Sequence, residues 1–301
     1  MTELKTALDR LYDSFNAPDS AFDPVQVVQR YPRLEDREIV GFVASAVAFG
    51  RVASVVNSTN AICEVLGKRP AQLLAKFNPD VHGRRLRPLV HRWTRGDDFV
   101  ALLWILRAFI KEHGSLESAF AAGVAADDVD VGPGIESLST RARQVDLAPA
   151  YGSRGAALEG PRAPGVFYFF PRPSSGSACK RMNLYLRWMI RRDGVDPGGW
   201  TAVPSSKLVI PLDTHIIRVG RCLKLTRYQS PGWKMAADIT ASLRKLDPDD
   251  PVKYDFSLCH LGMMGGCSFG SGGAGLQAPR HACQLAGVCH PKQRARKRRV
   301  A

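Results

Sequence analysis

The chain of 301 residues is long enough for one large or two modest domains, and its 45% hydrophobic content can fill a core. This composition excludes a disordered or fibrous protein. No stretch approaches the roughly 18 apolar residues of a membrane span, and the opening MTELKTALDRLYDSF is typical of an amphipathic helix rather than a signal peptide. We therefore expect a cytoplasmic protein without a membrane partner.

The charge balance is strongly basic, with 42 Lys and Arg against 28 Asp and Glu. The last twelve residues, HPKQRARKRRVA, hold six of the basic side chains and no acid, and removing these six leaves 36 basic residues against 28 acidic ones. Such a surplus favours a polyanionic partner, most commonly nucleic acid. The alternative is a solvated basic surface followed by a tail that binds nothing.

Helical periodicity runs through the first 120 residues and indicates helices over about 4–15, 35–49, 53–67 and 97–114, without a convincing strand. We assign residues 1–145 to one helical domain. Between residues 146 and 176, ten of 31 residues are Gly or Pro, which predicts a long loop. Its VFYFF segment (166–170) would be a short strand or an apolar plug. A second helical region follows at 177–266, and a cysteine-containing basic tail at 267–301. The predicted fold class is all-α.

The segment GSACKRMNLYLRWMIRR (176–192) predicts an amphipathic helix that begins near Ser177. Its apolar side would be buried, while Lys180, Asn183, Arg187 and Arg191 would share the opposite face. Residues 172–192 contain six Lys or Arg and no acid, and backbone N–H groups at Gly176 and Ser177 could bind a phosphate. Taken alone, this pattern also fits an ordinary helix with a solvated basic face.

Downstream, LVIPLDTHIIRVGRCLKL places Asp213 at the N-cap position of another helix. Capping alone would explain this residue. A carboxylate held at a helix N-terminus also stays ionised, as a group that stabilises a developing cation must.

These two segments resemble the helix-hairpin-helix (HhH-GPD) DNA glycosylases. GSACKRMNLYL aligns without a gap on GVGRKTANVVL of the endonuclease III type, and PLDTHIIRV is similar to VDTHIFRV. VHRWTRGDDF, RWMIRRDGVDPGGW and LDPDDPVKYDF also resemble the DUF2400 family, over about residues 30–265. The resemblance implies a two-lobed helical fold, with Lys180 as the catalytic lysine and Asp213 as the catalytic aspartate. Two departures matter: 33 positions separate these residues, a spacing similar to that of archaeal 8-oxoguanine glycosylases, and SSGSA replaces the usual hairpin opening.

In glycosidic-bond cleavage the sugar becomes positively charged, so a fixed carboxylate would lower the barrier while a neutral amine attacks the sugar. Arg181 and Arg187 would help to lower the pKa of Lys180. An extruded base needs a wedge and a stacking partner. Phe49 or Arg51 could supply the wedge, and Trp93 or Trp200 the stacking face, although each aromatic ring could equally be core packing.

Cys259, Cys267, Cys283 and Cys289 crowd the last fifth of the chain, which in this compartment indicates a metal site rather than disulfides. The resemblance implies a 4Fe-4S cluster, because the final C-x5-C spacing is kept, although Arg280 occupies the expected second ligand position. Zinc is the alternative ion, and an empty, reduced site is the alternative to both.

We therefore expect a monomeric, nucleoid-associated DNA repair enzyme that acts on double-stranded DNA containing a damaged base, with an oxidised base as one candidate. Base excision and AP-lyase cleavage would proceed through a Lys180 Schiff base. A base-modifying enzyme on the same scaffold and a catalytically inactive DNA-binding protein are the alternatives. RNA binding is not excluded by phosphate contacts alone.

Overall fold

The computed structural model describes residues 2–20, 22–152, 165–263 and 284–290. Within these ranges the chain is predominantly helical, as the sequence predicts. The helices are α1 (Thr2–Phe15), α2 (Val25–Gln29), α3 (Leu34–Ala46), α4 (Val52–Leu66), α5 (Pro70–Ala75), α6 (Gly83–Leu86), α7 (Gly96–His113), α8 (Leu116–Ala121), α9 (Gly132–Ala142), α10 (Ala148–Tyr151), α11 (Lys180–Ile190), α12 (Thr214–Cys222), α13 (Trp233–Arg244) and α14 (Asp255–Met263). Short 3-10 helices are η3 (Gly165–Phe169), η4 (Pro173–Ser175) and η5 (Ser205–Lys207).

The helix boundaries follow from local chemistry. Ser115 begins α8 by accepting a hydrogen bond from the backbone N–H of Ser118, and Asp213 begins α12 in the same way with Ile216. Gly67 and Gly114 end α4 and α7 at positive φ angles of 71° and 85°, a conformation that glycine adopts without steric cost.

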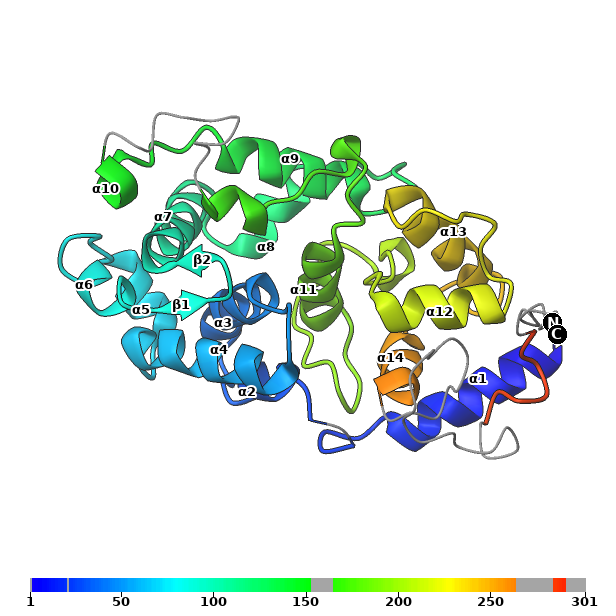
Figure 1. Cartoon of the computed structure of the whole chain (residues 1–301). Helices are drawn as coiled ribbons and strands as arrows, with labels where there is room; N and C mark the ends of the chain where they lie inside the picture. Colours follow the sequence, from blue (N-terminus) through cyan, green and yellow to red (C-terminus); the bar gives the residue numbers. More distant parts are fainter. Residues whose placement is uncertain (1, 21, 153–164, 264–283, 291–301) are drawn as a thin grey trace, which may run out of the picture.

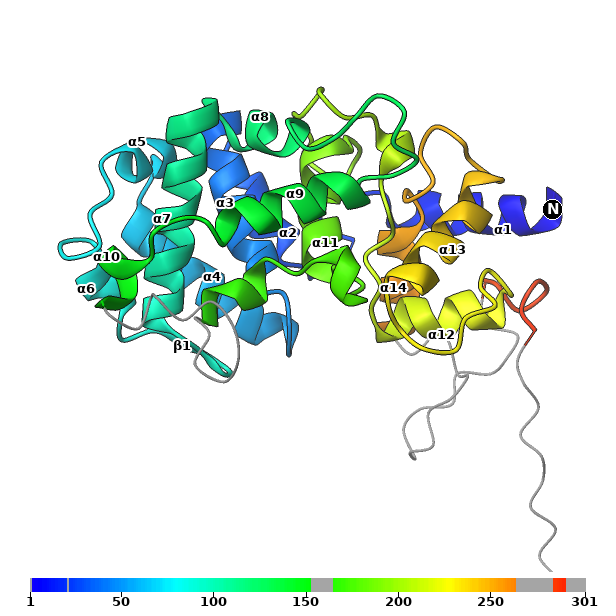
Figure 2. The ribbon, with the colours of Figure 1, turned by 90° about the horizontal axis from the view of Figure 1, so that it is seen from above.

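The helices form two lobes on either side of α11 (Figures 1 and 2). One lobe contains α2 to α10, and the other contains α1, α12, α13 and α14. Helix α11 packs on α3 of the first lobe, and α1 packs on α14 of the second. The first helix of the chain therefore completes the lobe that is built from its last helices.

Helix α11 is the centre of the molecule. Most of its side chains are buried, including Trp188 and Tyr185. The Tyr185 ring lies edge-on to Phe42 of α3 at 4.9 Å between centroids and to Trp200 at 5.2 Å. Because both sides of this helix are enclosed, its position fixes the two lobes relative to each other.

Three details differ from the sequence prediction or decide between its alternatives. Residues Val90–His91 (β1) and Thr94–Arg95 (β2) pair as a small antiparallel hairpin inside the region predicted to be helical almost throughout and to lack a strand. The VFYFF segment is the apolar plug, with Phe167, Phe169 and Phe170 buried. Helix α11 begins at Lys180 rather than near Ser177, because Cys179 adopts a left-handed conformation with a φ of 47°.

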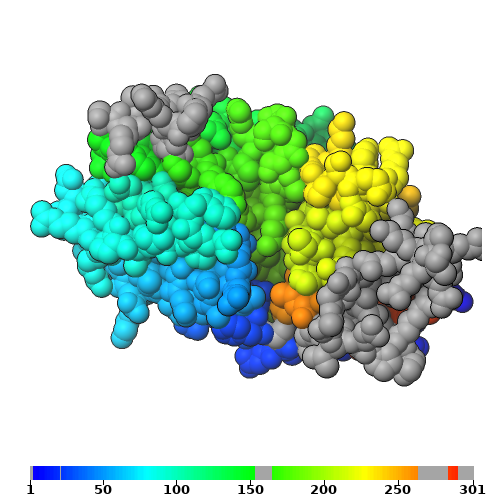
Figure 3. Space-filling model, viewed as in Figure 1, coloured from blue at the N-terminus to red at the C-terminus, as the bar shows by residue number. Residues whose placement is uncertain are grey.

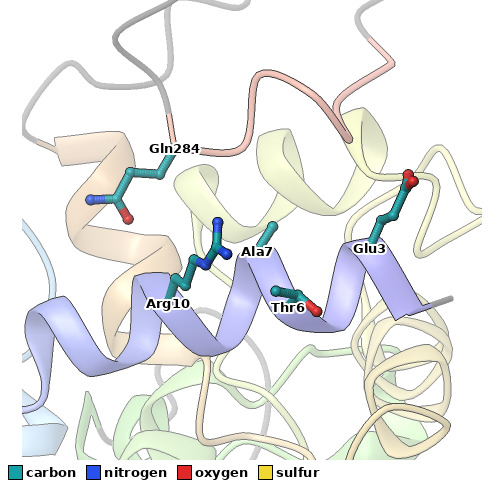
Figure 4. Close-up of a pocket in the computed structure, with 5 residues that line it drawn as sticks. All are labelled: Glu3, Thr6, Ala7, Arg10 and Gln284. Carbon is teal, nitrogen blue, oxygen red and sulfur yellow. The ribbon is translucent and has the colours of Figure 1, made fainter.

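No helix in the described part of the chain combines the length and apolarity needed to cross a bilayer. Two large hollows lie away from α11, because no residue of that helix lines them. One of about 650 Å³ lies between α1 and the segment around Gln284 and is lined by Glu3, Thr6, Ala7 and Arg10 (Figure 4). Its lining lacks an aromatic ring and a buried polar group, so it offers no constellation for chemistry.

Candidate functional site

A tight turn presents Lys180 at the start of α11. Gly176 has a φ of 79°, and the Ser177 hydroxyl accepts a hydrogen bond from the Cys179 N–H at 3.1 Å. The buried Asn183 amide donates to the Ala178 carbonyl at 3.1 Å and so ties the turn to the next helical turn. This local bonding makes Lys180 the first residue of the helix, and its side chain extends away from α11 toward the segment that follows α3.

The Lys180 ammonium lies against the end of α3. Its Nζ donates to the carbonyl oxygen of Ala48 at 3.2 Å, and no carboxylate pairs with it within the described residues. It lines a pocket of about 270 Å³ whose walls also include Phe49, Tyr168 and Arg181. None of the residues lining this pocket is acidic, so the amino group faces a cavity without a neutralising partner.

Aromatic rings from three separate segments meet at this pocket. Phe49 follows α3, Trp93 lies in the β1–β2 turn and Tyr168 lies in η3. The Phe49 and Trp93 rings stack at 4.8 Å between centroids, and Tyr168 stands edge-on to both at 5.3 Å. Trp93 is 53% exposed and Tyr168 is 40% exposed. We call Phe49, Trp93 and Tyr168 the aromatic cluster.

Two guanidinium groups border the aromatic cluster. The Arg181 guanidinium carbon lies 3.7 Å from the Tyr168 centroid, and its nitrogens donate to the carbonyls of Tyr168 and Ala46. The Arg92 guanidinium lies 5.5 Å from the centroid of Trp93. Burial lowers the pKa of Arg181 to about 10, so it remains a cation at neutral pH. The cluster therefore consists of apolar rings that are flanked by positively charged groups.

Asp213 is held at both carboxylate oxygens. Its Oδ1 accepts from the Ile216 N–H at 2.7 Å, as the cap of α12, and its Oδ2 accepts from the Cys259 thiol of α14 at 3.1 Å. Burial raises the pKa of Cys259 well above its usual value, and the nearby Asp213 and Asp255 carboxylates add to the effect. The thiol therefore keeps its proton and remains a donor to Asp213.

Lys180 is the first residue of α11, and Asp213 is the N-cap residue immediately before α12, the next α-helix. Within the described residues no hydrogen bond or ion pair joins the two side chains to each other. The space-filling view shows a hollow between the blue-to-green lobe and the yellow lobe, with α14 in orange at its lower end (Figure 3). The hollow lies between the lobe on which α11 packs and the lobe that contains α12.

The predicted outward position of Arg187 and Arg191 is wrong, because both guanidinium groups are buried in a network of carboxylates. Arg187 pairs with Asp196 at 3.0 Å and also with Asp255. Arg191 pairs with Asp193 and Asp250, each at 2.8 Å, and also with Asp196. Neither arginine is available to a phosphate or lies at the Lys180 pocket.

Two further predicted contacts are corrected by burial. Asn183 is fully buried and supports the turn before α11, so it is not exposed as the predicted DNA contact would require. Trp200 is part of the core, where its indole N–H donates to Glu38 at 3.2 Å and its ring stacks on Phe120 at 6.1 Å. It therefore cannot stack on an extruded base in this conformation.

The remaining predicted contact residues are accessible. Gly176, Arg51 and Trp93 are exposed, while Ser177, Phe49 and Arg181 are partly buried. Arg51 lies immediately before α4 and has no ion-pair partner within the described residues. Sequence reasoning missed Tyr168 and Arg92, because the rings that meet here come from segments far apart in the chain. The run of aromatic residues at 166–170 was the available signal.

The cysteines predicted to bind a metal are separated in the described structure. Cys289 forms a disulfide with Cys222 at the end of α12, and Cys259 bonds to Asp213. Cys267 and Cys283 lie outside the described residues. Among the residues that are described, no group of three His, Cys, Asp or Glu side chains could hold a metal ion.

Comparison with known proteins assigns the chain to a family. Residues 23–264 match the profile of DUF2400, which is described as a protein of unknown function. The chain belongs to the DUF2400 family. No curated protein and no solved structure matches the chain. Both Lys180 and Asp213, together with the aromatic cluster, fall within the matched DUF2400 region.

Proposed function

We propose that this DUF2400 protein is a DNA glycosylase that removes a damaged base and then cleaves the strand as an AP lyase. The observation that carries the proposal is the position of Lys180. It is the first residue of α11, directly after a tight turn, and it lines a pocket with aromatic walls and no acid. An amine in such a pocket suits attack on a sugar whose base is held by the rings.

In the proposed reaction the neutral Lys180 amine attacks C1′ of the target nucleotide. The C1′–N bond to the base breaks, its electron pair leaves with the base, and the base takes up a proton. Loss of the amine proton and opening of the sugar ring give a Schiff base between Nζ and C1′. Removal of a C2′ proton then expels the 3′ phosphate by β-elimination.

Asp213 is proposed to stabilise the positive charge that develops on the sugar during the first step. The two bonds to its oxygens, from Ile216 and Cys259, support this role because they hold the carboxylate in one orientation. Preorganised charge costs no rearrangement at the moment of reaction. The same bonds also explain Asp213 as a cap, so a test must separate the two roles.

The finer fold assignment, a helix-hairpin-helix glycosylase fold, belongs to the same proposal. It is supported by the all-α architecture, the two lobes and the turn-then-helix geometry at 176–183. The partner would be duplex DNA bound by a basic surface, with Gly176, Ser177, Arg51 and Arg181 as the accessible contact residues.

A bound 4Fe-4S cluster or zinc ion also stays a proposal, carried by the resemblance of the C-terminal cysteines. Cys289 cannot be a ligand while it is disulfide-bonded to Cys222, and Cys259 bonds to Asp213, so the two described cysteines do not fit a shared centre. No step of the reaction is assigned to a metal. Iron and zinc analysis of protein purified anaerobically under reducing conditions would test the metal directly.

The test of the function uses a duplex with one abasic site, which requires no knowledge of the natural lesion. Borohydride reduces a Schiff base to a stable covalent link, so wild-type protein should become attached to this DNA. Lys180→Gln should abolish the link and the strand cleavage, whereas Lys245→Gln, a change at an exposed lysine beyond α13, should leave both intact. A panel of lesion-bearing duplexes would then identify the base removed.

Two results would contradict this assignment. If Lys180→Gln is trapped as efficiently as wild type, another amine forms the link and Lys180 is a phosphate contact. If wild type binds DNA but is never trapped, the protein is a base-modifying enzyme or a DNA-binding protein without catalytic activity.

A further inference from the structure

The aromatic cluster has an exposed side that the packing of the protein does not use. Trp93 and Tyr168 contact each other and Phe49, yet about half of the Trp93 side chain and two fifths of the Tyr168 side chain remain open to solvent. Most large aromatic side chains in the described residues are enclosed in the core, for example Trp188 and Phe42. Solvent-exposed rings gathered from three segments are typical of a binding surface.

The charges around the cluster restrict what it can bind. Arg181 covers one face of Tyr168, and Arg92 lies beside Trp93. Lys180 and Arg181 line the adjoining pocket, which contains no carboxylate. A cationic ligand would be repelled, and a purely apolar peptide would leave the charges of these cations unneutralised. A ligand with flat rings and negative charges matches both features, and this combination is that of a nucleotide.

The size of the pocket restricts the ligand further. Its volume of about 270 Å³ is just below the roughly 300–1,000 Å³ of sites for drug-sized molecules. It therefore has room for a single base. Phe49 and Tyr168 belong both to the pocket and to the exposed cluster, so the two form one continuous surface. A base that has left its stack can rest on the rings while its backbone follows the cations.

We propose that Phe49, Trp93 and Tyr168, with Arg181 and Arg92, form a platform that binds an unpaired nucleobase by stacking. The protein would then prefer single-stranded or unstacked positions to regular duplex. The inference shares one premise with the proposed function, namely that the partner is a nucleic acid. It does not need Lys180 chemistry, because stacking accepts undamaged bases.

The test measures affinity of the full chain for a labelled oligothymidylate of about 12 nucleotides and for a backbone of the same length without bases. Trp93→Ala and Tyr168→Ala should each weaken oligothymidylate binding by roughly 5- to 150-fold, the range for losing one stacked base. Neither change should alter binding of the base-free backbone. Trp93→Phe keeps a ring and should retain most of the affinity.

Tyr228→Ala is the matched control. Tyr228 also lies beside an arginine, with the Arg227 guanidinium 5.3 Å from its centroid, but it belongs to the connection between α12 and α13. This variant should bind oligothymidylate like wild type. An oligouridylate arm tests whether RNA serves equally, since stacking does not distinguish the two sugars.

The platform is overturned if Trp93→Ala and Tyr168→Ala bind oligothymidylate as tightly as Tyr228→Ala. It is also overturned if they weaken the base-free backbone equally, because the rings would then act through the fold. Borohydride trapping is scored separately. If wild type is trapped but the ring variants bind oligothymidylate normally, the platform is contradicted and the proposed enzyme activity stands. If the ring variants bind weakly but wild type is never trapped, the platform stands and the proposed enzyme activity is contradicted.

Discussion

The two ends of α11 use basic side chains in opposite ways. At the start of the helix, Lys180 and Arg181 bond to backbone carbonyls and aromatic faces, and neither meets a carboxylate within the described residues. At the end, Arg187 and Arg191 are buried among four aspartates. From the sequence alone, both ends were predicted to belong to one exposed basic face of the helix.

The difference decides which end can attract a polyanion. A carbonyl or a ring satisfies the hydrogen bonds of a cation but leaves its net charge unneutralised, so the start of α11 still attracts anions. A guanidinium surrounded by carboxylates is neutralised and acts as part of the core. Function is therefore expected at one end of α11 and structural support at the other.

The largest expected effect is on stability, at the structural end. Arg187→Met should lower the free energy of unfolding by about 3–5 kcal/mol, because it leaves the buried Asp255 without its cation and the buried Asp196 with Arg191 alone. Urea unfolding of the variant and of wild type would measure the loss. Arg192→Met, a change at the exposed neighbour, is the control and should have little effect. A variant at Arg187 with wild-type stability would show that the network is not needed to hold the lobes.

This contrast also explains how far the sequence can predict the molecule. The all-α class, the long helices and the cap at Asp213 follow from periodicity and from the chemistry of helix ends, which are local. The apolar stripe at Met182, Tyr185 and Met189 was likewise correctly predicted to be buried. Local patterns suffice for these features because each depends on neighbours within a few residues.

The rest depends on partners far away in the chain. Arg187 was expected to face solvent because the residues that bury it, Asp196 and Asp255, lie on other segments. Trp200 follows two glycines and was predicted to lie in a loop, yet its side chain is buried against Glu38 and Tyr185. Tyr168 could not be identified as part of the candidate site from its local sequence, because the residues that it contacts there, Phe49 and Arg181, lie elsewhere in the chain.

A medium effect is expected at Asp213, where capping and catalysis can be separated. Asp213→Ala removes the acceptor for the Ile216 N–H and should cost about 0.5–2 kcal/mol of unfolding free energy. Asp213→Asn keeps an oxygen for that bond, although not for the bond from the Cys259 thiol, and should therefore be more stable than Asp213→Ala. Trapping on a damaged-base duplex should fall in both variants, by on the order of a hundredfold or more, if the charge stabilises the sugar cation. Full activity in Asp213→Asn would leave the residue as a cap only.

The smallest expected effect is a pH dependence at the structural end. Burial raises the pKa of Asp255 to about 7; the nearby Arg187 opposes this shift, and the Asp213 and Asp196 carboxylates reinforce it. A folded-state pKa above the ordinary value of 3.8 means that the folded protein binds more protons than the unfolded chain between these two pH values. The contribution of Asp255 to stability is therefore fully present below about pH 4 and is lost as the pH rises through about 7.

Asp255→Asn tests this contribution because the amide has the same shape but does not titrate. At about pH 5 the variant should differ little from wild type, since the wild-type carboxyl is largely protonated in the fold. At about pH 8 wild type must keep a buried carboxylate that the variant lacks, so the stability of the variant relative to wild type should rise between the two pH values. Urea unfolding at both pH values measures the change, with the exposed Asp249→Asn as a control that should show none. A difference between Asp255→Asn and wild type that stays constant with pH would mean that Asp255 is ionised throughout. The aspartates around Arg187 and Arg191 would then be paired as completely as the geometry suggests, without a proton shared among them.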